Sequence, residues 1–198
     1  MTDLSKLHVL LVAGSPRGNS STSALLRFVA DELARDGCVV DFLDLAAEPL
    51  AHFNPDTTYA AAHYPALRAR VHRADALVLG TPDYHGSVSG ALKNFLDHFW
   101  QEFTGKLFAT IVASHEKGLT VTDQLRTVAR QCYAWSLPYG VAYADPEDMK
   151  DGKIISTALQ KRIEMLVRDV RVYGELLARQ RRADLAGTEP GFLAKLRK

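Results

Sequence analysis

The sequence predicts a doubly wound α/β domain, in which a five-stranded parallel sheet of order 2-1-3-4-5 carries helices on both faces. Apolar runs of strand length alternate along most of the chain with longer stretches of helical period. This alternation implies a parallel sheet that is covered on both faces. Polar, glycine-containing loops also follow the first and third apolar runs, and a doubly wound sheet binds its ligand between these two positions.

Each element rests on its own pattern of apolar residues. We expect strands at residues 7–13, 39–43, 76–80, 107–113 and 139–143, which are short apolar runs. Helical spacing predicts helices at residues 23–35, 66–74, 88–100, 120–135 and 154–181. Residues 44–64 are long for a plain connection and are typical of a lid or binding loop. We therefore predict one domain at residues 1–182 and a C-terminal tail at residues 183–198.

The composition excludes several classes of function. The formal net charge is +1, so no strong overall field would recruit nucleic acid or an anionic membrane. The chain shows no signal-peptide pattern and no apolar run of transmembrane length, which makes the cytoplasm the expected location. The two cysteines, Cys38 and Cys132, are expected in the core. The seven histidines lack metal-ligand spacing, so we expect no bound metal.

The loop at residues 14–23 is the most informative segment, because it joins the first predicted strand to a helix. Helix N-termini carry unpaired N–H groups and a partial positive charge, so this loop can cradle an anion. Arg17 adds a planar charged group suited to phosphate. The neutral donors are the hydroxyls of Ser15, Ser20, Ser21, Thr22 and Ser23. An ordinary capped helix is the alternative, but the number of hydroxyls favours a phosphate site.

The type of phosphate compound is narrowed by what this loop lacks. The dinucleotide fingerprint G-x-G-x-x-G is missing, because the only glycines are Gly14 and Gly18. The ATP-type loop is missing too, since no lysine follows Gly18. A second polar loop, at residues 81–97, follows the third predicted strand, and its Tyr84 could lie against a ligand ring. Its alternative is a turn followed by a well-capped helix.

These two loops resemble the motifs of one family, the NADPH-dependent FMN reductases of the flavodoxin-like superfamily. Residues 14–17 (Gly-Ser-Pro-Arg) are similar to its G-S-x-R phosphate loop. Residues 81–97 are similar to its signature P-E-Y-N-G-S-x-P-G-x-L-K-N-x-x-D. The likeness covers residues 7–143, and it implies a flavodoxin-like fold and the cofactor FMN.

The resemblance also implies roles for particular residues. The FMN phosphate would be held by Ser15, Arg17, Ser21, Thr22 and Ser23. The flavin ring and ribityl chain would lie along Pro82, Asp83, Tyr84, His85 and Gly86, with Ser114 in the third loop. The following helix would be structural, with Lys93, Asn94 and Asp97 among its residues.

The sequence departs from the family pattern at three places. Asp83 stands where the family usually has Glu, and His85 stands where it usually has Asn. The third loop, residues 114–118, contains one glycine where relatives often have several. These changes place titratable side chains beside the expected ring and can alter flavin affinity or access.

The resemblance implies an FMN-dependent NAD(P)H oxidoreductase with ping-pong chemistry. A hydride would pass from NADPH, or NADH, to N5 of FMN, and the electrons would then pass to a quinone, a flavin or a similar small-molecule acceptor. No side chain need act as a nucleophile, so we expect no catalytic residue in that sense. The basic residue that recognises the nucleotide 2′-phosphate could be Arg17, Lys117 or Arg126.

Other functions stay open at this stage. The chain could be a flavodoxin-type electron carrier, a reductase that uses FMN as a diffusing substrate, or a flavodoxin-like domain that has lost flavin. Assembly of several subunits is a further expectation, because aromatic residues gather on the helix after the second loop and just beyond it, namely Phe95, Phe99, Trp100 and Phe103. Those residues favour a homodimer, or a homotetramer, whose contact walls the flavin site.

Overall fold

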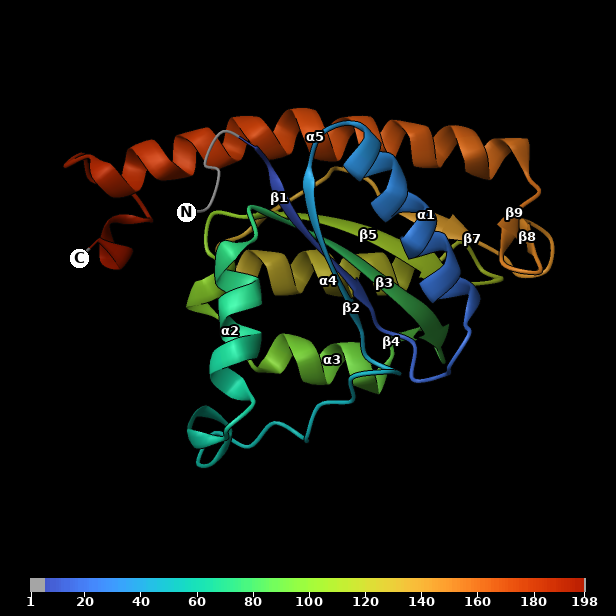
Figure 1. Cartoon of the computed structure of the whole chain (residues 1–198), viewed down its shortest axis with the longest axis horizontal. Helices are drawn as coiled ribbons and strands as arrows, with labels where there is room; N and C mark the ends of the chain where they lie inside the picture. The colour runs from blue at the N-terminus through green and yellow to red at the C-terminus, as the bar shows by residue number, and fades with distance from the viewer. Residues whose placement is uncertain (1–5, 198) are drawn as a thin grey trace.

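The computed structural model describes residues 6–197, which form a doubly wound α/β fold (Figure 1). The helices are α1 (Ser21–Arg35), α2 (Tyr64–Arg73), α3 (Gly90–Asp97), α4 (Leu119–Gln131) and α5 (Thr157–Ala186). The strands are β1 (His8–Ala13), β2 (Val39–Asp44), β3 (Ala76–Tyr84), β4 (Ser87–Val88), β5 (Leu107–Ala113), β6 (Trp135–Ser136), β7 (Val141–Tyr143), β8 (Met149–Lys150) and β9 (Lys153–Ile154). Short 3₁₀ turns lie at Thr58–Ala60, Gln101–Phe103 and Ala194–Leu196.

The main sheet has the predicted strand order. It runs β2-β1-β3-β5-β6, with β7 also paired to β5, so β6 and β7 together occupy the fifth position. All of these pairs are parallel. Within the register, Ala13 lies opposite both Asp44 and Gly80, and Ala113 lies opposite Pro82 and Tyr143. The carboxyl ends of the strands therefore meet at one edge, which is where the loops after β1, β3 and β5 emerge.

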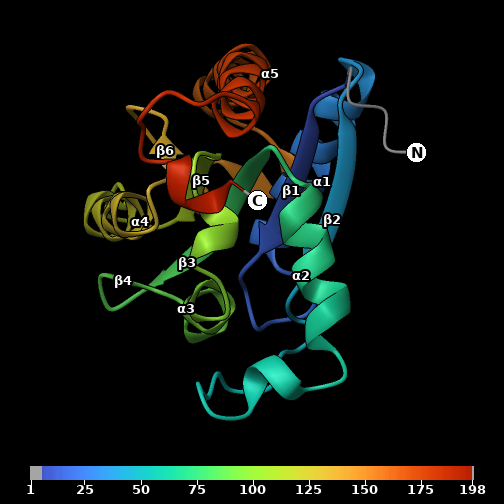
Figure 2. The same ribbon diagram turned by 90° about the vertical axis from the view of Figure 1, so that its left-hand side faces the viewer.

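Two apolar cores lie on opposite faces of the sheet, as side chains alternate along each strand. Val9 and Leu11 of β1 join the core under α1 and α5. Leu10 and Val12 join the core under α2, α3 and α4. Figure 2 shows these two groups of helices on either side of the sheet. Cys38 and Cys132 are free and buried, as the sequence predicted.

Several predicted boundaries were wrong, and local capping or pairing explains them. Strand β3 continues past residue 80 to Tyr84, because its end turns back as a hairpin onto β4. Helix α3 begins at Gly90, not at residue 88, since Ser89 caps it. Helix α4 ends at Gln131, and Trp135 belongs to β6. Helix α5 begins at Thr157, because the β8–β9 hairpin precedes it, and it continues to Ala186.

The segment after α5 folds back onto the chain. Leu193 is buried, and the ring of Phe192 stacks on Tyr133 with centroids 6.4 Å apart. Arg197 donates hydrogen bonds to the carbonyls of Asp184 and Glu189. Within residues 6–197, no helix is long and apolar enough to span a membrane.

The aromatic residues expected at a subunit contact lie mostly inside this chain. Phe95, Phe99 and Phe103 are buried and pack against one another in the core between α2, α3 and the sheet, with tilted or T-shaped ring pairs. Trp100 is 57% exposed. Of these four aromatic side chains, Trp100 is therefore the one that is not buried within the chain.

Candidate functional site

The first loop presents an anion cradle at the start of α1. Ser20 is the N-cap of this helix, and its hydroxyl accepts a hydrogen bond of 3.1 Å from the N–H of Ser23. The next N–H groups, those of Ser21 and Thr22, have no protein acceptor among the described residues. The first turn of α1 carries no acidic side chain. Unpaired N–H groups at a helix start attract an anion, and nothing acidic in that turn opposes it.

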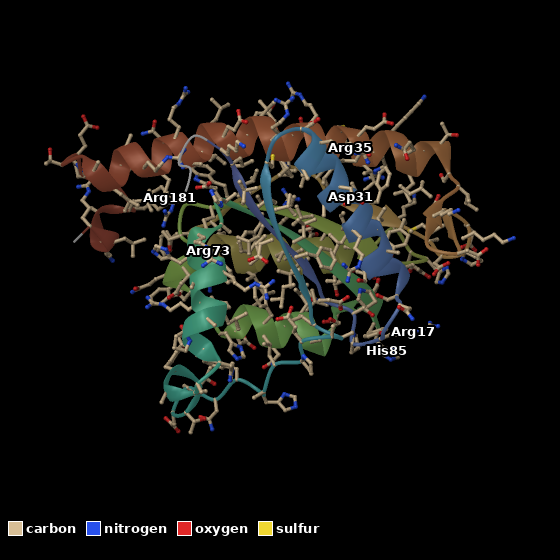
Figure 3. All side chains as sticks on the ribbon, viewed as in Figure 1. Arg17, Asp31, Arg35, Arg73, His85 and Arg181 are labelled. Atoms are coloured by element: carbon tan, nitrogen blue, oxygen red, sulfur yellow. The ribbon has the colours of Figure 1, made fainter. Side chains whose placement is uncertain are left out.

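The predicted hydroxyls of this loop are brought together, but they do not share one environment. Ser15 is buried, and its hydroxyl accepts from the N–H of Arg17 at 3.2 Å. Ser23 donates to the carboxylate of Asp44 at 2.7 Å, so its proton is already engaged within the fold. The side chain of Arg17 is exposed at the rim (Figure 3).

Tyr143 joins this cluster from the end of β7, although no sequence motif pointed to it. Its hydroxyl lies 3.2 Å from Ser21 Oγ and 3.4 Å from Thr22 Oγ1. Burial raises the pKa of the Tyr143 phenol, which therefore keeps its proton near neutral pH. Tyr143 orients the two hydroxyls from a position 122 residues away from Ser21 along the chain.

The second loop is a tight β-hairpin between β3 and β4. Asp83 pairs with Val88 and Tyr84 with Ser87, which leaves His85 and Gly86 as a two-residue turn. Both turn residues have positive φ, 57° for His85 and 75° for Gly86, as a type I′ turn requires. The turn exposes the His85 side chain at the same end of the molecule as Arg17 (Figure 3).

Asp83 joins the second loop to the third. One carboxylate oxygen accepts from the N–H of Gly86 at 2.7 Å, and the other accepts from the hydroxyl of Ser114 at 2.9 Å. The shorter Asp side chain, where the family usually has Glu, therefore spans the gap between the two loops.

Gln124, on α4, is a further residue that sequence reasoning missed. Its amide oxygen accepts from Ser87 Oγ at 3.1 Å and from the N–H of Val88 at 3.2 Å. Its amide nitrogen donates to the carbonyl of Gly86 at 3.2 Å. These three bonds fix the hairpin on α4.

Ser89 connects the second loop to the first. Its N–H donates to Thr81 Oγ1 at 3.0 Å, and its hydroxyl donates to the carbonyl of Gly14 and caps the N–H of Leu92. The Gly14 N–H bonds to the carbonyl of Gly80 at 2.8 Å. A Cβ at Gly14 would lie 2.7 Å from that carbonyl oxygen, so only glycine fits between the two loops.

The second and third loops enclose a cleft of about 610 Å³ at the carboxyl edge of the sheet. Its walls come from the hairpin, the end of β5 and the start of α4. The lining includes the predicted residues Asp83, His85, Gly86 and Ser114, together with Ala113, His115, Glu116, Leu119, Thr120 and Asp145. Pro82 and Tyr84 lie on the same hairpin outside this lining.

This arrangement suits FMN better than a metal or a nucleophile. The first loop offers unpaired amides and neutral hydroxyls to a phosphate, and the cleft at the same edge of the sheet has room for a ring system. Within the described residues, no group of three or more His, Cys, Asp or Glu side chains could hold a metal ion. The fold and the site thus define a doubly wound flavin mononucleotide protein.

Comparison with known proteins identifies the family. Residues 7–147 match the NADPH-dependent FMN reductase family, and the chain belongs to it. The FMN-dependent NADPH-azoreductase of Staphylococcus aureus is 30% identical over 150 residues, which is 72% of this chain and 79% of the relative. The protein is therefore an FMN-dependent NAD(P)H oxidoreductase, as the sequence predicted.

Solved structures agree with the fold. The apo form of the NADH:FMN oxidoreductase EmoB has a TM-score of 0.70 at 19% identity, covering 85% of this chain and 90% of that one. FerB, an NAD(P)H:(acceptor) oxidoreductase from Paracoccus denitrificans, has a TM-score of 0.69 at 22% identity, covering 88% and 98%. Identities this low support the flavodoxin-like architecture alone.

Proposed function

We propose that this chain reduces small aromatic acceptors, azo compounds and quinones among them, with electrons from NADPH. The observation that carries this proposal is the cleft between the second and third loops, which lies at the same carboxyl edge of the sheet as the loop before α1. FMN whose phosphate is bound by the first loop would extend its flavin ring into that cleft. The azoreductase relative supports the azo compounds as acceptors.

In this proposal, each loop has a separate task. Ser15, Arg17, Ser21 and Thr22 hold the FMN phosphate directly. Ser23 supports them by anchoring the first turn of α1 to Asp44 through its hydroxyl. Pro82, Asp83, Tyr84, His85, Gly86 and Ser114 position the ring. FMN, when bound, supplies the hydride-accepting and electron-donating chemistry. The exposed rings of Tyr84 and His85 shield the ring edge from water on the open side.

The test is the visible spectrum of the purified protein with added FMN, before and after anaerobic NADPH. We expect a bound flavin band that bleaches promptly with NADPH and returns when an azo dye or a quinone is added. A bound flavin that stays oxidised would instead indicate an electron carrier. The absence of flavin binding would show that the chain has kept the fold of the family and lost its flavin-dependent function.

We also propose a cytoplasmic homodimer. Trp100 supports a subunit contact, because it is the large exposed aromatic residue that directly follows α3 and its capping turn. Light scattering after size-exclusion chromatography would measure the oligomeric state of the wild type and of Trp100→Ala. We expect the wild type to be a dimer and Trp100→Ala to be a monomer.

A further inference from the structure

A second cleft continues from the first around the third loop. It measures about 460 Å³ and shares Ser114, His115 and Leu119 with the cleft of about 610 Å³ described above. From there it runs between α4, the end of β7 and the start of α5, past Thr122, Tyr143 and Arg162. The two clefts therefore border one another at the third loop and the start of α4.

The two clefts differ in charge. The first has no lysine or arginine in its lining, and its charged residues are Asp83, Glu116 and Asp145. The second is lined by Lys117 and Arg162. These two side chains are the permanent cations along the combined cleft, as far as the described residues show.

Both cations are available for a ligand. Within residues 6–197, neither Lys117 nor Arg162 forms a salt bridge. Arg162 donates one bond of 2.6 Å to the carbonyl of Gly140, which fixes its planar group and leaves its other N–H groups unused. The one carboxylate that lines this cleft, Asp148, accepts from the N–H of Ala144 at 2.9 Å.

The other basic residues near the site are less suited to bind a further anionic group of a ligand. Arg126 faces Asp123 at 3.6 Å on the exposed side of α4 and lines neither cleft. Arg17 lies in the first loop, where the proposed FMN phosphate already needs a cation. A second phosphate group would thus find its cations, Lys117 and Arg162, in the second cleft.

We propose that Lys117 and Arg162 bind the 2′-phosphate of NADPH. The nicotinamide end then lies in the first cleft and the adenosine 2′-phosphate lies in the second. This assignment rests on the proposed use of the first cleft by the flavin and its hydride donor. Arginine and lysine together suit a phosphate dianion, since the guanidinium offers a fixed pair of donors and the ammonium a mobile charge.

The first experiment measures binding without flavin, by calorimetry with 2′,5′-ADP and with 5′-AMP. Wild-type protein should bind 2′,5′-ADP more tightly than 5′-AMP. Lys117→Gln and Arg162→Gln should each weaken 2′,5′-ADP binding roughly tenfold, because each removes one charge-assisted contact. Binding of 5′-AMP should not change. Arg126→Gln, which neutralises an exposed cation on the adjoining helix, is the matched control and should bind both compounds as the wild type does.

The second experiment uses the enzyme loaded with FMN. Both variants should raise KM for NADPH roughly tenfold, leave kcat unchanged, and leave KM for NADH unchanged. Equal affinity of the wild type for 2′,5′-ADP and 5′-AMP would overturn the assignment, as would a loss in Arg126→Gln equal to that in Arg162→Gln. Failure of the wild type to oxidise NADPH would refute the proposed function, and the calorimetry would still test the subsite on its own.

Discussion

The hydroxyl of Ser89 donates a hydrogen bond to the carbonyl of Gly14, which lies 75 residues earlier in the chain. This bond is buried, and it links the first and second loops of the proposed cofactor site. The same hydroxyl accepts from Leu92 N as the N-cap of α3. One side chain therefore starts a helix and sets the separation of the phosphate loop from the ring loop.

We expect Ser89→Ala to lower the free energy of unfolding by about 2–3 kcal/mol, from the lost cap together with the lost buried bond. Ser156→Ala is the matched control, because Ser156 caps α5 in the same way without a second loop to hold. It should cost about 1 kcal/mol. Urea unfolding measures both variants, and FMN affinity should fall only in the first. Equal losses of stability would mean that the bond to Gly14 contributes nothing.

The double variant Arg17→Ala/Ser21→Ala tests the phosphate assignment. Its FMN dissociation constant should rise about 100-fold, because two contacts to a charged phosphate are lost. Riboflavin lacks the phosphate, so its affinity should not change. Arg35→Ala, at the far end of the same helix (Figure 3), serves as the control for a lost arginine. Fluorescence titration of each protein with both flavins measures these affinities, and equal losses for FMN and riboflavin would rule out a phosphate contact.

The fold was predictable because local patterns determine most of it. Apolar runs separated by helical stretches predict a parallel sheet, and the observed strand order is the doubly wound order that five such strands fit. The predicted boundaries that were wrong fall where only a few residues determine the local structure, as at the two-residue strands β8 and β9. Short strands of this kind have no periodicity that a sequence pattern could reveal.

The site was predictable only in its loops. The spacing of the sequence motifs predicted the first and second loops as binding loops, and the structure places both at one edge of the sheet. Tyr143, Gln124 and Ser89 were missed, because each acts through bonds to residues 36 to 122 positions away. Such partners leave no trace in local sequence. The aromatic pattern of α3 was ambiguous for a related reason, since a core and a subunit contact select the same residue types.

Gln124→Met should loosen the ring loop while keeping the volume of the side chain. Three bonds to Gly86, Ser87 and Val88 are lost, so the free energy of unfolding should fall by about 1–3 kcal/mol. Riboflavin and FMN affinity should fall by the same factor, because the phosphate loop is not touched. Gln160→Met, which loses one exposed bond on α5, is the control and should leave both affinities unchanged. A weaker affinity for FMN alone would contradict this role for Gln124.

His85→Asn should stabilise the hairpin. His85 has φ of 57° at the first position of a type I′ turn, where Asn is better tolerated than other side chains. The free energy of unfolding should rise by less than about 1 kcal/mol. His85→Ala is the matched variant and should lower it, since alanine has no side chain that bonds locally in this conformation. Thermal melts of the three proteins give the order, and a destabilised Asn variant would show that His85 makes a compensating contact.

Lys106 gives the stability a pH dependence. Lys106 is buried immediately before the start of β5. Its amine donates to the carbonyls of Val71 and His72 at the end of α2. Burial, aided by the charge of Arg181, lowers the pKa of Lys106 from 10.5 to about 7. Between these two values the unfolded chain holds a proton that the folded chain has released, so the free energy of unfolding rises with pH across this window.

The expected contribution to this rise is at most about 1.4 kcal/mol per pH unit. Lys106→Met keeps the length of the side chain, and it should give a smaller rise from pH 7 to pH 10.5 than the wild type. Across this window the folded amine is neutral, so the loss of its two hydrogen bonds shifts the curve without changing the slope. Lys153→Met, at an exposed lysine, should keep the wild-type slope. Parallel curves for wild type and Lys106→Met in urea titrations would mean that this amine keeps its proton inside the fold.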